Sequence, residues 1–186
     1  MRGFDYRILE EEIVYTGREL RSGWVRERVG YEGDVGVGFV GACHVANEDL
    51  VDLDDAREGE FIKAASMAHV IIEHAGRDLE TAVLRQRLLV VILCEILAKK
   101  GFAVERSGDD VFFGGRKLTV SIAAPGPQST LIHLGINVDP EGAPVPAAGL
   151  GEMEIAPREL LAELLETYRL ETASVRHATR KVRDVP

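Results

Sequence analysis

Hydrophobic positions in the first half of the chain recur mostly with the two-residue period of β-strands. Short β-rich runs at 6–9 and 13–15 predict two strands. Over Val35–Val45, valine, phenylalanine and glycine alternate, which predicts a strand whose glycine face lets another segment approach closely. The run Ala68–His74 suits either a helix or a strand, and its β-branched residues, with Gly76 soon after them, favour a strand.

The second half of the chain contains the clearest helix signal. Leu79–Lys100 is long, amphipathic and strongly apolar, with Asp78 at the N-cap position and Gly101 at its end. Further predicted elements are strands at 102–105, 110–113, 117–123 and 131–138, a hairpin turn at 114–115 and a final amphipathic helix at 157–170. Strands in hairpins, interrupted by one long helix and followed by another, predict an α+β fold. Without an internal repeat or linker, residues 1–186 are expected to form a single domain.

Four segments of different composition lie between these elements or after the last of them. Residues 17–32 are polar and rich in arginine, and residues 49–60 are acidic, which predicts a loop or a short helix. Residues 140–151 are rich in proline, glycine and alanine, which is typical of a loop over the surface or over a site. Residues 176–183 are basic, and we expect a solvated or subunit-contacting end there.

Composition and charge exclude several classes of function. The 186 residues are 46% apolar and 28% charged, the balance of a globular protein, and the formal net charge of -9 argues against nucleic-acid binding. Two isolated cysteines, Cys43 and Cys94, indicate neither a disulfide framework nor a metal site. The sequence opens without the apolar core of a signal peptide, and no apolar run approaches the ~20 residues of a membrane span. We therefore expect a cytoplasmic protein without membrane contact.

One set of short motifs points to a known superfamily. Residues 108–110 read Gly-Asp-Asp, residues 115–118 read Gly-Arg-Lys-Leu, and residues 135–138 read Gly-Ile-Asn-Val. This order resembles the core of biotin protein ligases, in which a P-N-D turn leads into G-[RK]-K-[LI] and then G-I-N-V. His133, together with the Asn-Val-Asp of 137–139, equally resembles the H-x-x-x-N-V-D pattern of octanoyltransferases and lipoate ligases. The whole chain is similar to an uncharacterised microbial family placed in this superfamily.

The resemblance implies a fold and a reaction. The fold would be a largely antiparallel sheet packed with helices, like that of class II aminoacyl-tRNA synthetases. Ligases of this type join a carboxylate to ATP as an acyl-adenylate and then pass the acyl group to a lysine. The implied cofactors are ATP and Mg²⁺, and the implied partners are a small carboxylic acid or acyl donor, an acceptor protein and a second copy of the chain in a homodimer.

The resemblance assigns Lys117 the role of electrostatic catalyst, because a fixed lysine stabilises the negative charge that develops on phosphate and carboxylate oxygens. It places Asp110, His133 and Asn137 around the same pocket. Each has an ordinary structural alternative. A lysine after a turn is most often solvated, Asp110 can start the turn, and His133 is as well explained as a hydrogen-bonded core histidine. Asn137 has several hydrogen-bonding positions to satisfy on an apolar strand, so a ligand or turn contact is expected.

Other positions depart from the superfamily pattern. Arg18 and Arg21, followed by Trp24, take the place of the G-R-G-R-R-G loop that meets the anionic end of the ligand, although surface arginines would explain them as well. Val120 stands where the family has a glycine, and Ala148 stands nearest to the octanoyltransferase cysteine, which argues against a cysteine thioester route.

Two rival functions therefore remain beside the transferase or ligase. The first is a binding module that keeps the fold and the pocket without the chemistry. The second is a structural partner that dimerises through an edge strand and supports another protein. Binding of ATP, or release of pyrophosphate with a carboxylate, would separate the enzyme from both, because recognising a fold does not establish its function.

Overall fold

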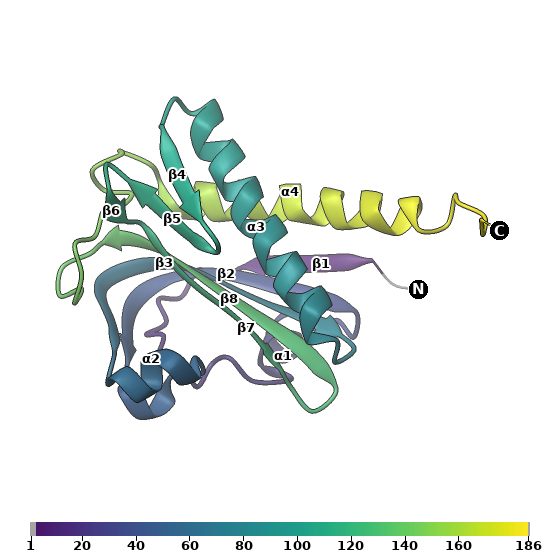
Figure 1. Ribbon diagram of the computed structural model, residues 1–186, viewed down its shortest axis with the longest axis horizontal. Helices are drawn as coiled ribbons and strands as arrows, with labels where there is room; N and C mark the ends of the chain where they lie inside the picture. Colours follow the sequence, from purple (N-terminus) through teal and green to yellow (C-terminus); the bar gives the residue numbers. More distant parts are fainter. Residues whose placement is uncertain (1–2, 186) are drawn as a thin grey trace.

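A computed structural model describes residues 3–185 as a five-stranded sheet with helices on both faces (Figure 1). In spatial order, the strands are β1 (Phe4–Ile8), β2 (Asp34–Val45), β3 (Ile62–Ala75), β8 (Ser129–Asp139) and β7 (Thr119–Pro125). Only the edge pair β1–β2 is parallel, and the other neighbouring pairs of this sheet are antiparallel. A second, three-stranded sheet joins β4 (Val104–Ser107), β5 (Asp110–Phe113) and β6 (Arg116–Lys117). The α+β class expected from the sequence is confirmed.

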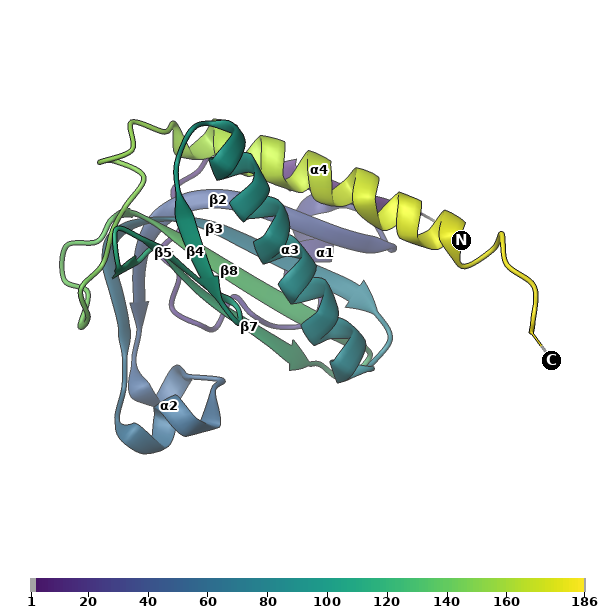
Figure 2. The ribbon, with the colours of Figure 1, turned by 45° about the horizontal axis from the view of Figure 1, so that its top comes forward.

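The two long helices, α3 (Leu79–Lys99) and α4 (Pro157–Ala178), cover one face of the larger sheet (Figures 1 and 2). The short helix α1 (Trp24–Val29) lies on the opposite face. A 3-10 turn, η1 (Asn47–Asp49), and a short helix, α2 (Leu53–Glu58), form the connection between β2 and β3 and stand well away from α3 and α4 (Figure 2). No helix among residues 3–185 has the length and apolar character needed to cross a bilayer.

The alternation along β2 divides the core into two layers. Val35, Val37 and Phe39 are fully buried on the α1 face, whereas Gly36 and Gly38 face α4. A Cβ atom at Gly38 would lie 2.8 Å from Ile8 Cδ1 and 3.3 Å from Leu161 Cβ of α4. The glycine face therefore lets α4 pack directly on the strand, as the sequence predicts.

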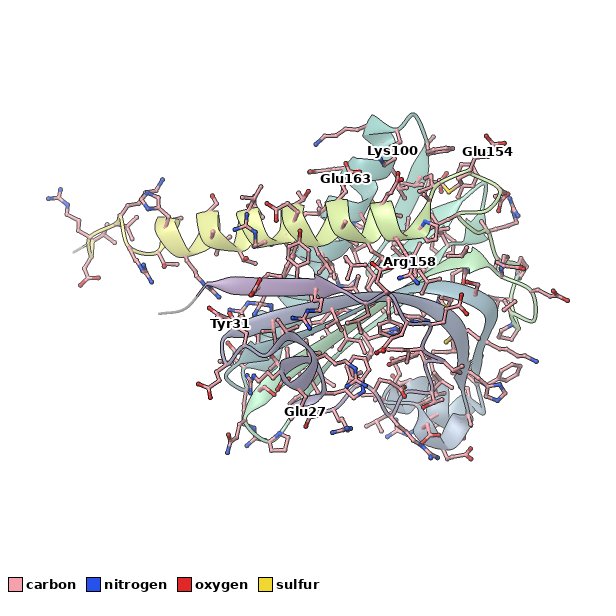
Figure 3. All side chains as sticks on the ribbon, turned by 180° about the vertical axis from the view of Figure 1, so that it is seen from behind. Glu27, Tyr31, Lys100, Glu154, Arg158 and Glu163 are labelled. Carbon is pink, nitrogen blue, oxygen red and sulfur yellow. The ribbon has the colours of Figure 1, made fainter. Side chains whose placement is uncertain are left out.

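One ion pair and two hydrogen bonds to backbone carbonyls hold the N-terminal half of α4 in place. Lys100, just after α3, forms an ion pair with Glu163 of α4 at 2.8 Å (Figure 3). On the same helix, Arg158 donates hydrogen bonds to the carbonyls of Leu9 and Glu10, which follow β1. Helix α4, in the C-terminal part of the chain, is thereby joined to the segment that follows β1 in the N-terminal part.

Several predicted boundaries differ from the structure. Strand β3 begins at Ile62, not Ala68, and the predicted strand at 117–123 is divided into β6 and β7. The division occurs at Leu118, where the chain passes from one sheet to the other. The side chain of Leu118 is buried, and its N–H donates a hydrogen bond to Val111 O. The run at 13–15 forms only a bridge to Cys43. Helix α4 continues past Leu170 to Ala178, so the basic tail begins inside a helix.

The predicted caps and hairpin are confirmed. Asp78 accepts hydrogen bonds from the N–H groups of Glu80 and Thr81 at the start of α3. Gly114 and Gly115, between β5 and β6, have φ values of 56° and 72°, the left-handed conformation that a tight two-residue hairpin needs at both central positions.

Candidate functional site

A cavity of about 280 Å³ lies between the β2–β3 connection and the ends of β7 and β8. Its walls come from four stretches of the chain, residues 15–17, 45–63, 109–122 and 133–147. The loop after β8 contributes residues 143–147, as expected for a loop over a site. Of the seven residues selected from the sequence, the cavity wall contains Lys117, Asp110, His133 and Asn137.

Lys117 is the last residue of β6, and its peptide is held on both sides. Its N–H donates to Pro146 O, and its carbonyl accepts from Ala148 N, each at 3.0 Å. Asn137 Nδ2 donates a further hydrogen bond to the same carbonyl at 3.2 Å. The side chain is about one-third exposed, and its Nζ lies 3.1 Å from Asp110 Oδ1. The backbone thus fixes the origin of a lysine whose ammonium group reaches the cavity.

The turn before β5 is tied to helix α3 through Asp109, which also lines the cavity. Gln86 Nε2 donates to Asp109 Oδ2 at 2.8 Å and to Ser121 Oγ at 2.9 Å. Arg87 forms an ion pair with the other carboxylate oxygen of Asp109 at 3.1 Å. The sequence indicated only a turn at Asp109. A buried glutamine on an otherwise apolar helix face was the available signal, because such a group needs polar partners.

Asn137 occupies β8 beside Lys117, with 6% of its surface exposed. Its backbone N–H donates to Leu118 O at 2.9 Å, and its carbonyl accepts from Leu150 N at 2.8 Å. Its side-chain Nδ2 donates to Lys117 O. Within residues 3–185, no protein donor bonds its Oδ1, which is not one of the buried side-chain atoms that lack a partner and so is open to the cavity.

His133 forms the floor of the cavity within a stack of rings. The ring of Tyr15 lies parallel to it at 4.0 Å between centroids, and His69 Nδ1 lies 3.1 Å from His133 Nε2. Burial lowers the pKa of His69 to about 3, and burial, with the repulsion that a protonated His69 would add, holds the pKa of His133 well below its ordinary value. Both rings are therefore neutral near pH 7. No motif in the sequence predicted that Tyr15 would stack on His133.

The remaining three selected residues lie elsewhere. Arg18 is 76% exposed and forms an ion pair with Asp49 at the cavity margin, at 3.2 Å. Arg21 is exposed, and among the described residues it is not part of the cavity wall. Trp24 is buried against Phe39, with the guanidinium of Arg28 stacked 3.7 Å from the centre of its ring.

A buried carboxylate anchors the segment that carries these residues. Glu73 of β3 is fully buried, accepts hydrogen bonds from Gly23 N and Ser129 Oγ, and lies 3.3 Å from Arg26 Nη1. The arginine-rich stretch is therefore fastened to the sheet through its backbone and Arg26. Arg18 is the only one of the selected arginines that reaches the cavity margin.

The two departures from the superfamily pattern have visible consequences. Val120 lines the cavity, and its Cγ2 would lie 3.1 Å from a Cβ atom at Gly135, so it occupies the space above that glycine. Ala148 is fully buried and contributes its N–H to Lys117 O, with no thiol at that position.

The cavity wall is strongly acidic. It contains the carboxylates of Asp49, Asp52, Asp55, Glu60, Asp109 and Asp110. Against these six, it contains the ammonium groups of Lys63 and Lys117. Because His133 is neutral, the wall carries a clear excess of negative charge. No group of three or more His, Cys, Asp or Glu side chains within residues 3–185 is arranged to hold a metal ion.

Comparison with solved structures shows the same fold in biotin and lipoate ligases. The biotin protein ligase of Leishmania major in complex with biotinyl-5-AMP superposes with a TM-score of 0.54 and 14% identity, over 98% of this chain and 81% of that one. Lipoate-protein ligase A bound with ATP superposes with a TM-score of 0.54 and 15% identity, over 92% of this chain and 86% of that one. The biotin/lipoate ligase-like fold expected from the motifs is confirmed.

More similar chains cover nearly the whole length. A protein of unknown function from Pyrococcus horikoshi superposes with a TM-score of 0.94 and 38% identity, over 99% of this chain and 100% of that one. An uncharacterised protein of Methanocaldococcus jannaschii is 34% identical over 181 residues, which are 94% of this chain and 82% of the relative. With residues 4–183 matching its family profile, the chain belongs to the family described as Domain of unknown function (DUF366).

Proposed function

We propose that the protein transfers or ligates the acyl group of a small carboxylic acid, or of its activated form, with Lys117 as the electrostatic catalyst. One observation carries the proposal. Lys117 extends into a cavity from a peptide held by Pro146, Ala148 and Asn137. A preorganised ammonium group stabilises charge without having to reorganise during the reaction, which is how such groups lower barriers.

The chemistry assigned to Lys117 is stabilisation of an oxyanion. The nucleophile of the acceptor adds to the carbonyl carbon, and the electron pair of the C=O bond moves to its oxygen, beside the ammonium. The carbonyl then re-forms as the bond to the leaving group breaks, and the leaving group takes the proton that the nucleophile gives up. Removing one donor of this kind typically costs about 10²–10³ in rate.

The neighbouring residues would position the acyl group. Asp110, 3.1 Å from Lys117 Nζ, holds the ammonium at the cavity wall. Asn137 steadies the Lys117 peptide and offers a free Oδ1 to the ligand. The neutral His133, stacked on Tyr15, provides a flat floor against which an apolar acyl chain can pack.

ATP, which the fold family implies, does not fit this wall well. A triphosphate carries several negative charges, whereas six carboxylates and two lysines line the cavity. Of the selected arginines, Arg18 is already paired with Asp49, and Arg21 is outside the cavity wall. We therefore assign no step to ATP, and an acyl group that arrives already activated suits the residues better.

A non-catalytic binding protein is the second candidate. Two features favour it: Ala148 offers no nucleophile, and Val120 fills space above Gly135. Such a protein would bind a small carboxylate at Lys117 and release it unchanged.

Catalysis is tested with four substrates: octanoyl and lipoyl thioesters, and octanoate or lipoate together with ATP. Formation of transferred or hydrolysed acyl product, or of pyrophosphate, is compared in wild type, Lys117→Met and Arg116→Met. Arg116 neighbours Lys117 on β6 but pairs with Glu152 at 2.6 Å, outside the cavity wall, so its variant is the matched control. We expect a loss of about 100-fold or more in Lys117→Met alone. Equal rates in Lys117→Met and wild type would contradict the catalytic role, and acid binding without any product would favour the binding protein.

A further inference from the structure

Two segments of the chain expose faces that no other part of residues 3–185 covers. The first is the β2–β3 connection, residues 46–61, whose helix α2 has no buried residue. The second is the C-terminal segment, residues 173–185, in which α4 continues past Thr172, its last buried residue. Because most helices in proteins are stabilised by packing of an apolar face, each segment presents a helix that lacks a packing partner.

Exposed apolar side chains gather on these two segments. Of the eleven large apolar residues that are exposed within residues 3–185, six belong to them. On the connection they are Val51, Leu53 and Phe61. On the C-terminal segment they are Val175, Val182 and Val185. Exposed apolar patches with polar surroundings commonly mark surfaces that bind another protein.

The connection is strongly acidic. It contains seven carboxylates and one cation, Arg57. Two of the carboxylates are paired, Asp49 with Arg18 and Asp54 with Arg57. The other five form no ion pair among the described residues, and they are Glu48, Asp52, Asp55, Glu58 and Glu60. A surface with this excess of negative charge attracts a basic partner.

The C-terminal segment carries the opposite charge. Arg180, Lys181 and Arg183 are exposed and form no ion pair within residues 3–185. The single carboxylate of this segment is Asp184. The two segments that expose apolar side chains therefore complement each other in charge as well.

The two segments cannot meet within one molecule. In Figure 1 the connection, with α2, lies at the lower left, whereas the end of α4 extends to the right beyond the sheet. The view of Figure 2 agrees, with α2 and the C-terminal end on opposite sides. The C-terminal segment of one copy can reach only the connection of another copy.

We propose that copies of this chain associate head to tail, with the C-terminal segment of one copy docked on the β2–β3 connection of the next. The apolar side chains of the two segments would cover one another, and Arg180, Lys181 and Arg183 would meet the unpaired carboxylates. Because the contact joins two different surfaces, it allows either a closed ring or a growing chain of copies.

The contact would also change the cavity wall. Val51 and Phe61 of the connection line the cavity, as do Asp52, Asp55 and Glu60. The C-terminal segment of the next copy would therefore lie beside the cavity mouth, where its cations would offset the negative charge of this wall. The inference goes beyond the proposed function and does not depend on the role of Lys117.

Two charge-reversal variants of the full chain separate the two surfaces. The first, Arg180→Glu/Lys181→Glu/Arg183→Glu, changes the C-terminal segment and leaves the connection intact. The second, Glu48→Lys/Glu58→Lys/Glu60→Lys, changes exposed carboxylates of the connection without altering Asp52, the cap of α2. The matched control for the second is Glu10→Lys/Glu11→Lys/Glu12→Lys, which makes the same change in charge at three exposed residues elsewhere.

Sedimentation velocity at low salt measures the association. We expect wild type and the control to form dimers and larger species as the concentration rises, and each reversal variant to raise the dissociation constant about ten-fold or more. An equimolar mixture of the two variants should form a 1:1 dimer and nothing larger, because it contains one intact surface of each kind. In wild type, about 0.5 M salt should weaken the association, since it screens exposed charges.

Three results would overturn the inference. Wild type that remains monomeric at low salt and hundreds of micromolar has no such contact. Association that is unchanged in both variants, or that salt leaves unchanged in wild type, uses a different surface. A mixture of the two variants that stays monomeric, while wild type associates, would show that the two segments do not bind each other.

Discussion

Lys117 lies in the cavity wall because groups distant in sequence hold its peptide, the backbone of Pro146 and Ala148 from the loop after β8 and the side-chain amide of Asn137 from β8. The motif predicted that Lys117, Asp110, His133 and Asn137 would gather, and the cavity contains all four. The hydrogen bonds from Pro146 and Ala148 to the Lys117 peptide were not predictable, because backbone hydrogen bonds do not depend on residue identity, whereas a polar contact of the Asn137 side chain was expected. Trp24 was assigned to the ligand through a motif, whereas its ring is buried in the core.

Glu73 provides a test at the residue scale. Glu73→Gln keeps the shape of the side chain but leaves Arg26 without its charge partner and weakens the anchor of Gly23. We expect a loss of about 2 kcal/mol in the free energy of unfolding, measured by urea denaturation. Glu27→Gln, at an exposed acid on α1 (Figure 3), is the control and should change little. Equal stability of the two variants would mean that Glu73 is not an anchor.

Elements with a strong local signal were predicted well. Helix α3 has a cap, an amphipathic pattern and a glycine at its end, and β2 shows a clear alternation. The final helix was predicted to end at Leu170, where the apolar pattern ends. In the structure α4 continues, because Thr172 is buried and Arg176 forms an ion pair with Asp34. Tertiary contacts of this kind override the local pattern.

The glycines of β2 give a prediction at the element scale. A Cβ atom at Gly41 would lie 2.0 Å from the backbone oxygen of Ile13, so Gly41→Ala must displace the segment that crosses the strand there. We expect a destabilisation of about 1–3 kcal/mol, seen as a lower urea midpoint. Gly3→Ala has no atom within 4 Å of the added methyl group and serves as the control. A Gly41→Ala protein as stable as the control would disprove the close approach.

At the scale of the whole molecule, a buried polar cluster joins β2 and β3 to the C-terminal helix. Asp34 lies 3.1 Å from His74 Nδ1 and pairs with Arg176, and His74 Nε2 lies 2.9 Å from Tyr168 OH. Burial by itself would raise the pKa of Asp34, but His74, Ala75 N–H and Arg176 lower it to about 2. The ionised form is therefore favoured in the folded state.

This shift predicts how stability depends on pH. The pKa of Asp34 is lower in the folded state than in the unfolded state, where it is near 4. Ionised Asp34 therefore contributes about 2 kcal/mol to the free energy of unfolding above pH 4, and this contribution is lost as the pH falls towards 2. Urea denaturation of wild type and Asp34→Asn should therefore show a stability difference at pH 5 that shrinks by pH 2.5. A difference that stays constant over this range would show that Asp34 is not an ionised partner in the cluster.

The chain shares its fold with biotin and lipoate ligases, and its cavity wall contains six carboxylates beside two lysines. The central claim of the account is that Lys117, held in the cavity wall, is the group that meets the ligand. The most direct test is the dissociation constant of octanoate for wild type, Lys117→Met and Arg116→Met. The account predicts binding by wild type and Arg116→Met, with a loss of about ten-fold or more in Lys117→Met. Equal binding by all three proteins would contradict the role of Lys117 as the carboxyl-binding group.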